Sequence, residues 1–567
     1  MSSETPCPPE VKLPQGTYRG RLLPSSRYQP KPLDVFLGIP YACSTAGENR
    51  FRPAKPLQIS EAGSEAVVDA TELGPISPHT DAGAAPFPVG EDCLSVNVTR
   101  PALLKDKNER LPVLVYIHGG AFNMGFGADR DLASFVAHSK RDVVAVSFNY
   151  RLGVLGFLAL EGKGGKEGMN LGLGDQRLAM EWVKDNIAAF GGDPGKITTM
   201  GISAGGHSVG HHILSYTPQT APFHRAILES GSATSRAVWY PSHSRQKTQL
   251  ADFLLAAGVS PTEPDPLRAL RALPVSDLTT AACKVWQKYA PSVRWPFQPV
   301  IDNATSIPDK PLSLWEKGAG LRIPVITGFC TNEGTSFVPP CHSSPEFRSF
   351  FTTLVPTLTE ADLDLLEDLY PAPPAQPDLE SNDPRCQFAA PPPDPNLGPH
   401  WRRLEAAYAH YAYVAPVLYT AHRLSLSPNP PPVYVYEFAA LSPPLCTANH
   451  TDETPFVTHC LPELEPHRGL VDTSASMHAW FSDFVAGDGA LEGWPVFRSP
   501  LGADGAGVGK IMVFGRGNDE RVAAERGGKA NKGIPFEVRT MSDREVEQIK
   551  FWWDRTALSQ GFGERQE

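Results

Sequence analysis

Short runs of β-branched and other apolar residues recur along the chain, and they constrain its fold more than any other feature. These runs lie at residues 113–117, 143–148, 197–200, 323–327, 433–438 and 511–514. Near-continuous apolar runs of this length are typical of strands buried on both faces of a sheet. Helical patterns over residues 174–190 and 403–424 lie between them. Strands that alternate with helices predict an α/β fold with a mostly parallel central sheet flanked by helices.

The composition is that of a globular protein, and no shift in composition divides the chain into parts. Of the 567 residues, 41% are apolar and 20% are charged, which provides enough apolar material for a sizeable core. We expect one domain over residues 1–567, because large α/β enzymes run long as single units. Proline clusters within residues 371–399 predict an irregular surface excursion.

Charge and hydropathy exclude several classes of partner. The formal net charge is −11, and Lys and Arg do not cluster in runs. We therefore expect neither nucleic acid nor an anionic membrane as a partner. No run of 18 or more apolar residues predicts a transmembrane helix, and the first ten residues lack the basic and apolar regions of a signal peptide. The sequence gives no indication of the oligomeric state.

The cysteines favour a reducing compartment. Nine of them are scattered without paired spacing, and an odd number argues against a complete disulfide framework. No Cys/His cluster with the spacing of a zinc site is present. We therefore expect a cytoplasmic protein that needs neither a metal nor an organic cofactor.

A candidate nucleophile lies in the segment from Gly201 to Gly205, which has the sequence G-I-S-A-G. It fits the pattern G-x-S-x-G, follows the apolar run at 197–200, and precedes a helical pattern over 204–216. A strand, a tight turn and a helix in this order form a nucleophile elbow, in which small flanking residues leave the Ser203 hydroxyl exposed at the edge of the sheet. The alternative is an ordinary glycine-rich turn.

A second candidate element is the segment from His118 to Phe122, H-G-G-A-F, directly after the run at 113–117. Small residues at a strand end allow backbone N–H groups to approach a developing oxyanion. We expect Gly120 and Ala121 to donate these hydrogen bonds, together with Ala204. The alternative is a simple turn at the end of a strand.

These motifs and several others together resemble the type-B carboxylesterase/lipase family, which has the α/β-hydrolase fold, and fungal intracellular carboxylesterases within it. The matching segments stand in family order along nearly the whole chain. They begin at residues 36 (F-L-G-I-P-Y-A), 49 (N-R-F-R-P), 91 (E-D-C-L-S-V-N-V), 149 (N-Y-R-L-G), 175 (D-Q-R-L-A-M-E-W-V-K-D-N-I-A-A-F-G-G-D-P), 229 (E-S-G-S), 299 (P-V-I-D) and 551 (F-W-W).

The resemblance implies a Ser-His-Glu triad in the chain order Ser, acid, His. Glu333 lies in the segment T-N-E-G after the run at 323–327 and matches the triad acid of the family. His450 begins the segment H-T-D-E-T-P-F-V and matches the triad base. His459 and His467 lie nearby but lack the acidic and aromatic residues that follow the base in relatives. The carboxylate would orient the imidazole and stabilise its protonated form.

Departures from the family pattern bear on the substrate and the compartment. Secreted relatives close a disulfide at the position of Cys93, and the residue expected as its partner is Ser77 here. The loop over residues 78–92 lacks the Trp that holds choline in cholinesterases and has few large apolar residues for a lipase lid. Trp295 matches a position that lines the acyl pocket in relatives, although a place in the core is equally compatible with its sequence context. Position 202 is Ile where many relatives carry Glu.

The sequence thus predicts a serine carboxylic ester hydrolase that acts through an acyl-enzyme on small to medium soluble esters. Two alternatives remain open. A biosynthetic tailoring hydrolase or acyltransferase would use the same acyl-enzyme and differ only in the entering nucleophile. A non-catalytic scaffold of the neuroligin kind would have lost part of the triad, whereas this chain retains all three candidates.

Overall fold

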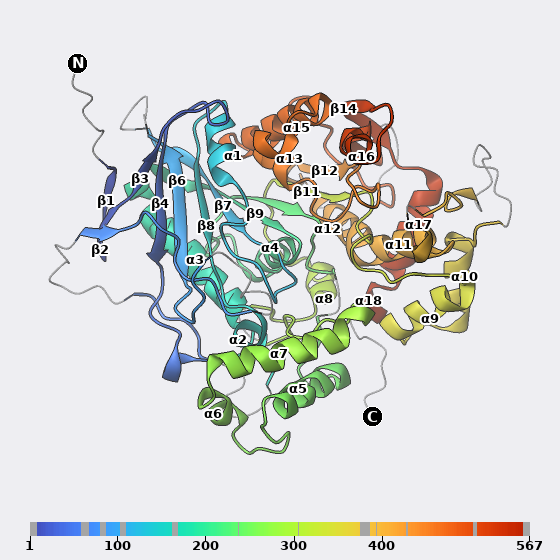
Figure 1. Ribbon diagram of the computed structural model, residues 1–567, viewed down its shortest axis with the longest axis horizontal. Helices are drawn as coiled ribbons and strands as arrows, with labels where there is room; N and C mark the ends of the chain where they lie inside the picture. Colours follow the sequence, from blue (N-terminus) through green and yellow to red (C-terminus); the bar gives the residue numbers. More distant parts are fainter. Residues whose placement is uncertain are drawn as a thin grey trace.

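The computed structural model describes residues 8–57, 67–79, 87–102, 109–160, 168–235, 238–303, 306–374, 386–392, 394–426, 429–502 and 507–559. Its centre is an 11-stranded sheet in the order β14-β13-β12-β11-β10-β9-β7-β8-β6-β4-β3 (Figure 1). These strands are β3 (Arg21–Leu23), β4 (Leu33–Pro40), β6 (Ser95–Pro101), β7 (Leu111–Ile117), β8 (Val144–Phe148), β9 (Gly192–Ile202), β10 (Arg225–Glu229), β11 (Val325–Cys330), β12 (Val433–Phe438), β13 (Lys510–Asn518) and β14 (Lys532–Thr540).

The middle of the sheet is parallel and its edges are antiparallel. The strands from β8 through β7, β9, β10, β11 and β12 to β13 pair in parallel, whereas β14, β6, β4 and β3 join in antiparallel fashion. The carboxyl ends of β7, β9, β11 and β12 therefore meet at one edge, which is where sites form in α/β sheets. A small sheet of β1 (Glu10–Leu13), β2 (Gly16–Arg19) and β5 (Val67–Asp69) accompanies the large one.

Helices cover both faces of the large sheet. Side chains of β7 alternate between two cores: Val113, Val115 and Ile117 face one, while Leu114 and Tyr116 face the other. The first core also contains α3 (Leu171–Asn186), α4 (Ala204–Ser215), α11 (Trp401–Ala409), α12 (Ala415–Ser425) and α17 (Asp543–Asp554). The second contains α1 (Leu132–His138), α13 (Thr454–Thr458) and α15 (Arg468–Ala486). This arrangement explains why the predicted strands are apolar without alternation.

The remaining helices lie around this framework. They are α2 (Gly153–Phe157), α5 (Ser244–Ala256), α6 (Pro266–Arg271), α7 (Val275–Tyr289), α8 (Pro311–Glu316), α9 (Ser344–Leu354), α10 (Glu360–Leu369), α14 (Leu461–Leu464), α16 (Glu520–Arg526) and α18 (Thr556–Ser559). Helices α5, α6 and α7 form a group at the bottom of Figure 1, and α9 and α10 lie at its right side. Among the described residues, no helix is both long enough and apolar enough to cross a membrane.

The prediction of an α/β fold with a mostly parallel sheet is confirmed, and each of the six predicted strands coincides with an observed one. The helix predicted over 174–190 is α3 followed by a short 3-10 turn. The helix predicted over 403–424 is interrupted by a π-helical turn, His410–Val414. Pro416 follows this turn and has no N–H for the helical ladder, which explains the irregularity.

The proline-rich segment 371–399 forms turns where it is described, with one 3-10 turn at Pro395–Leu397. Residues 375–385 and 393 lie outside the described residues, as do residues 80–86 of the loop from which we predicted substrate size.

Candidate active site

The predicted nucleophile lies between the end of β9 and the start of α4. Ser203 has φ 54° and ψ −120°, a conformation that non-glycine residues adopt only under strain. Its backbone N–H donates to the Glu229 carbonyl at 2.9 Å, and its carbonyl accepts from the His207 N–H at 2.8 Å. The turn is thus held from β10 on one side and from the first turn of α4 on the other.

The flanking glycines leave no room for side chains. A Cβ atom on Gly201 would lie 2.3 Å from the Gly205 carbonyl oxygen, and one on Gly205 would lie 2.0 Å from the Ile117 oxygen. Gly119 packs against the nucleophile itself, since its Cβ would lie 3.2 Å from that of Ser203. The small residues of the predicted elbow are therefore required by close backbone approach, as the sequence pattern indicates.

The predicted oxyanion loop turns beside Ser203, and the two line one pocket together. Gly120 has φ +102°, and a Cβ there would lie 2.0 Å from the Met124 oxygen, so only glycine fits. The Ala121 carbonyl accepts hydrogen bonds from the side-chain amides of Asn123 and Gln298, both at 2.8 Å. These bonds fix the peptide unit that follows Ala121. The unit that carries the Ala121 N–H, an expected oxyanion donor, is fixed by the Gly120 carbonyl, which accepts from the Asn123 and Met124 N–H groups, both at 2.9 Å. Ala204, the third expected donor, is the first residue of α4.

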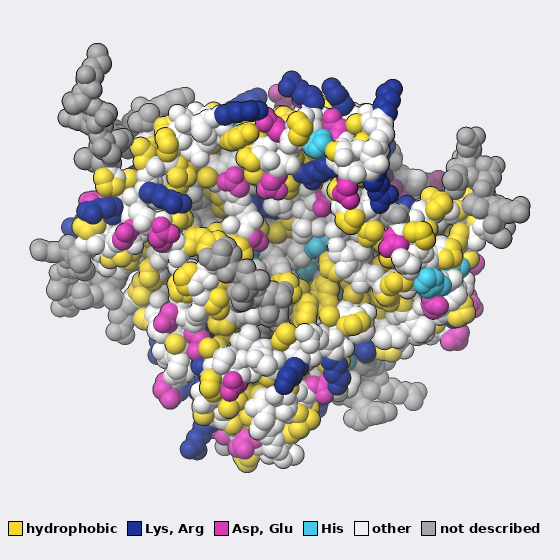
Figure 2. Space-filling model, viewed as in Figure 1, with side chains coloured by type: hydrophobic (Ala, Val, Ile, Leu, Met, Phe, Trp, Pro, Cys, Tyr) yellow, Lys and Arg dark blue, Asp and Glu magenta, His cyan; other side chains and the backbone are white. Residues whose placement is uncertain are grey.

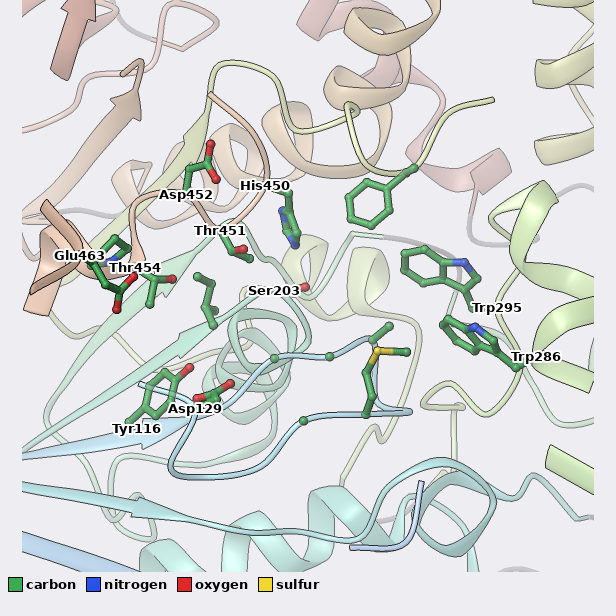
Figure 3. A pocket seen from close by; sticks show the side chains of 18 of the residues that line it. Tyr116, Asp129, Ser203, Trp286, Trp295, His450, Thr451, Asp452, Thr454 and Glu463 are labelled. Carbon is green, nitrogen blue, oxygen red and sulfur yellow. The ribbon is translucent and has the colours of Figure 1, made fainter. Parts of the chain in front are cut away.

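The predicted acid and base are in direct contact. Nδ1 of His450 hydrogen-bonds Oε2 of Glu333. Glu333 is fully buried, and its other oxygen accepts from the Cys330 N–H at 2.7 Å and from the Ser230 hydroxyl at 2.6 Å. Nε2 of His450 has no hydrogen-bond partner among the described residues. Figure 3 shows the imidazole directed toward Ser203.

A second buried carboxylate lies behind the acid. Glu453 accepts from the Cys330 thiol at 3.0 Å, from the Tyr436 hydroxyl at 3.2 Å and from the Ser230 hydroxyl at 3.3 Å. Burial raises the pKa of Glu453, and the charge of Glu333 raises it further. Ser230 thus bridges the two carboxylates, so that like charges close together share hydrogen-bond donors.

A buried ion pair lies on the other side of this cluster. Arg130 contacts Glu229 at 2.7 Å, and both side chains are fully buried. Burial raises the pKa of Glu229 to about 7, although the charge of Arg130 opposes the shift. Because Glu229 also carries the carbonyl that accepts from Ser203, the ion pair fixes the backbone beneath the nucleophile.

The acid loop is held by a fourth buried carboxylate, and a backbone hydrogen bond joins it to the base loop. Glu405 of α11 accepts from the Gly334 N–H at 2.9 Å and from the Asn332 side-chain amide at 3.2 Å. The Asn332 N–H donates to the Ala448 carbonyl at 2.9 Å. Burial raises the pKa of Glu405 to about 7. The loop that carries Glu333 is therefore joined both to Glu405 and to the loop that carries His450.

Ser203, His450 and the predicted oxyanion loop line one pocket of about 600 Å³, a volume typical of small-molecule sites. The face seen in Figure 2 is hollowed near its centre. Gly120, Ala121, Ser203 and His450 line the pocket. Its other lining residues are Tyr116, Gly119, Met124, Gly125, Asp129, Ile202, Trp286, Trp295, Phe337, Thr451, Asp452, Thr454, Pro455, Glu463 and Arg521.

One end of the pocket is aromatic. The rings of Trp286 and Trp295 stack with their centroids 5.6 Å apart, and Phe337 contacts Trp295 edge-on at 5.4 Å. Phe337 also lies against the His450 ring at 5.2 Å, and Tyr413, from the π-helical turn, lies 4.5 Å from it. Trp295 is therefore a half-buried pocket residue, and not part of the fully buried core.

The opposite end is polar and was not predicted from the sequence. Tyr116, Asp129, Asp452 and Glu463 lie there, on the side of Ser203 away from the tryptophans (Figure 3). Arg521 lines the same pocket and donates to the Glu463 carbonyl. These residues come from β7, from the loop before α1, from the base loop, from α14 and from α16. No local motif marks them, because only the tertiary fold brings them together. Only the fixed spacing of Asp452 after His450 could have pointed to one of them.

The structure places the predicted residues together and leaves the rejected histidine elsewhere. His459 hydrogen-bonds the Ser474 hydroxyl at 2.8 Å and packs against His138, away from the pocket lining. Cys93 is a buried free thiol, and burial raises its pKa to about 12. The Ser77 side chain hydrogen-bonds Cys93, in the position where the family pattern would put a disulfide partner.

Comparisons with known proteins identify the family of the chain. Residues 7–496 match the sequence model of the Carboxylesterase family. Secreted lipase 4 of Gibberella zeae is 35% identical over 411 residues, which cover 71% of this chain and 70% of that protein. The para-nitrobenzyl esterase of Bacillus subtilis is 33% identical over 340 residues, 59% of this chain and 66% of that protein.

Two further similarities concern activity and fold. A Byssochlamys spectabilis protein named inactive carboxylesterase-like protein VdtD is 31% identical over 425 residues, 71% of this chain and 70% of that one. The crystal structure of Aspergillus niger EstA superposes with a TM-score of 0.76 at 25% identity, covering 98% of this chain and 99% of that one. Together, the family match, the relatives and the fold show that this chain belongs to the carboxylesterase family and is a carboxylic ester hydrolase.

Proposed function

We propose that the protein hydrolyses small to medium soluble esters through a Ser203-His450-Glu333 triad and an acyl-enzyme intermediate. The observation that carries this proposal is the position of Ser203 on a strained elbow, in one pocket with a buried imidazole that Glu333 orients. Residues 1–567 would act as one catalytic domain. We include Gly120, Ala121 and Ala204 as the oxyanion hole and Trp295 as a wall of the acyl site.

The mechanism follows from the directions of these groups. Nε2 of His450 takes the Ser203 proton while the oxygen attacks the ester carbonyl, and the backbone N–H groups of Gly120, Ala121 and Ala204 stabilise the negative charge. The protonated His450 then gives its proton to the leaving alcohol, and the acyl group remains on Ser203. Water, deprotonated by the same imidazole, releases the acid and restores the serine.

Labelling with a fluorophosphonate tests whether the site is competent. We expect the wild-type protein to be phosphonylated at Ser203, as located by peptide mass spectrometry, and the Ser203→Ala variant to remain unlabelled. This experiment is needed because one relative is named inactive. A folded wild-type protein that resists labelling would favour a non-catalytic role.

A panel of esters with added alcohols separates hydrolysis from acyl transfer. Both reactions use the same acyl-enzyme, so they differ only in whether water or an alcohol enters. We expect the free acid as the main product across the panel. An alcohol acceptor that outcompetes water at low concentration would show that the protein is an acyltransferase.

We also propose an intracellular location, which rests on the buried Cys93 thiol beside Ser77. The word "secreted" in the names of two relatives, from Gibberella zeae and Arthroderma benhamiae, does not fit this proposal. Fractionation of the native cells and culture medium tests it, because an ester hydrolase activity recovered mainly from the medium would contradict it.

A further inference from the structure

The polar end of the pocket has no part in the mechanism described above. Asp129 is the residue of this end that stands out, because it keeps solvent-exposed surface yet lines the pocket that contains Ser203. Burial raises the pKa of its carboxyl to about 6 against the charge of Arg130, which leaves it mostly ionised at neutral pH. The Tyr116 hydroxyl hydrogen-bonds its carboxylate. No Lys, Arg or His of the described residues forms an ion pair with Asp129.

The nearest cations are engaged elsewhere. Arg130, the next residue in the chain, is fully buried, pairs with Glu229 at 2.7 Å and donates to the Thr454 hydroxyl at 3.3 Å. Arg521 donates to the Glu463 backbone carbonyl at 3.0 Å. Burial lowers the pKa of Arg521, and the charges of Asp452 and Glu463 oppose this shift.

Carboxylates therefore outnumber guanidinium groups around this end of the pocket. Of the described residues, Asp129, Asp452 and Glu463 are the acidic groups that line this end beside Arg521, and the Glu229–Arg130 ion pair is buried next to them. If Glu229 held a proton, three carboxylates would still face two cations. A concave site with an excess of one sign of charge attracts ligands of the opposite sign.

A second observation shows that a ligand belongs in this pocket. The His450 imidazole is nine-tenths buried, lines the same pocket, and leaves Nε2 without a hydrogen-bond partner among the described residues. That nitrogen is the group that must reach the leaving oxygen of an ester. Thr451 and Asp452, which follow it directly, belong to the polar end (Figure 3).

We propose that Asp129 selects esters whose alcohol portion carries a protonated amine. This inference rests on the ester hydrolase function proposed above and adds the substrate class. The two arms of an ester diverge from its carbonyl carbon. If the acyl arm lies against the aromatic end formed by Trp286, Trp295 and Phe337, the alcohol arm extends from His450 toward Asp129. An ammonium N–H there would donate a charge-assisted hydrogen bond to the carboxylate.

Two esters of nearly equal shape test this inference. Dimethylaminoethyl butyrate carries a protonated amine near neutral pH, and isopentyl butyrate has a C–H group in its place. We expect the wild-type kcat/KM to favour the cationic ester by about tenfold at low ionic strength. The Asp129→Asn variant keeps the size of the side chain and an acceptor for Tyr116. It should lose most of this preference while hydrolysing isopentyl butyrate at nearly the wild-type rate.

Glu463→Gln is the matched control, because it removes one negative charge from the exposed rim of the same end. We expect it to change the ratio of kcat/KM for the cationic ester to kcat/KM for the neutral ester much less than Asp129→Asn does. Equal effects of the two variants, or a wild-type ratio near one, would overturn the role of Asp129. If instead neither ester were hydrolysed in a Ser203-dependent way, the proposed function itself would fail, and the two failures are therefore distinguishable.

Discussion

The buried side of the pocket and its two ends are built in different ways. Ser203, Glu333 and His450 are at most 9% exposed, and strand ends and a network of hydrogen bonds hold them in place. Trp286, Trp295 and Asp129 are more exposed and come from separate loops and helices. The sheet therefore holds the proposed catalytic residues in place, whereas the choice of substrate depends on segments that can vary without disturbing those residues.

The largest loss of activity should come from a substitution on the buried side of the pocket. Ser203→Ala removes the nucleophile and should lower kcat for p-nitrophenyl butyrate by roughly 10⁴–10⁶, with some residual catalysis from the oxyanion hole. Because the pocket ends are untouched, KM should change little. Steady-state kinetics measure both constants, and circular dichroism serves as the control for folding. A variant that retained a large share of the activity would disprove the assignment of Ser203.

This part of the site was predictable from the sequence because each element is local. The elbow needs only a strand, five residues and a helix, and close packing requires Gly201 and Gly205 within that segment. The acid and base were assigned from the family resemblance, and their positions after β11 and β12 follow from the parallel sheet. The supporting residue Glu405 was not predicted, since nothing in the sequence of α11 links it to a loop 71 residues away.

Glu405 tests how far the buried network contributes to catalysis. Glu405→Ala leaves the Gly334 N–H and the Asn332 amide without their acceptor, at a cost of about 1–3 kcal/mol. If this cost disturbs the Glu333 loop, kcat should fall by roughly 10- to 100-fold. Glu405→Gln provides an oxygen for Gly334 and should restore most of the rate.

The pH–rate profile separates positioning from a general loss of structure. A displaced Glu333 would move the midpoint of the pH–rate profile in Glu405→Ala, and Glu405→Gln should return that midpoint to the wild-type position. A lower melting temperature with an unchanged profile and kcat would show that Glu405 only stabilises the fold.

The aromatic end should affect substrate choice and leave the chemistry intact. Trp295→Ala removes a large ring beside Trp286 and Phe337, so longer acyl chains gain room. The wild-type protein should hydrolyse esters with short acyl chains, from acetyl through butyryl, better than esters with long, fatty chains. The variant should raise kcat/KM for octanoyl relative to butyryl esters by about tenfold. A chain-length series of p-nitrophenyl esters measures this change.

Trp286→Ala is the comparison for that experiment, since Trp286 lies on α7 and contacts Trp295 but not Phe337 among the ring contacts of the described residues. Trp286→Ala should raise kcat/KM for octanoyl relative to butyryl esters by less than Trp295→Ala does. A wild-type kcat/KM that increased steadily up to palmitoyl esters would contradict the short-chain prediction, and an unchanged profile in Trp295→Ala would remove Trp295 from the acyl site.

Most of the residues that line the two ends of the pocket could not be predicted from the sequence, for physical reasons. Asp129 and Arg521 are far apart in the chain and come to line one pocket only through the tertiary fold, so no spacing rule indicates them. Trp295 was predictable as a candidate from its matching segment, but its exposure depends on Trp286 of α7 and on Phe337. Side chains brought together by packing are visible only in the folded chain.

The smallest expected effect concerns the base loop, where Asn449, His450 and Thr451 form an N-x-T glycosylation sequon. The Asn449 amide donates to the Ser336 hydroxyl at 2.7 Å, and its oxygen is buried. A glycan on this amide nitrogen would break the hydrogen bond to Ser336 next to the pocket-lining His450, so we expect Asn449 to remain unmodified even in a host that exports the protein. Asn303 begins the sequon N-A-T and is exposed, which makes it the internal control.

Peptide mass spectrometry of the exported protein compares the two sites directly. We expect a glycan mass on the Asn303 peptide and none on the Asn449 peptide, with ester hydrolysis unchanged. This contrast separates the geometry of the base loop from the compartment, because both sequons pass through the same pathway. A glycan on Asn449 in active protein would mean that the loop is more open than the hydrogen bond to Ser336 allows, and it would weaken the assignment of His450 as the base.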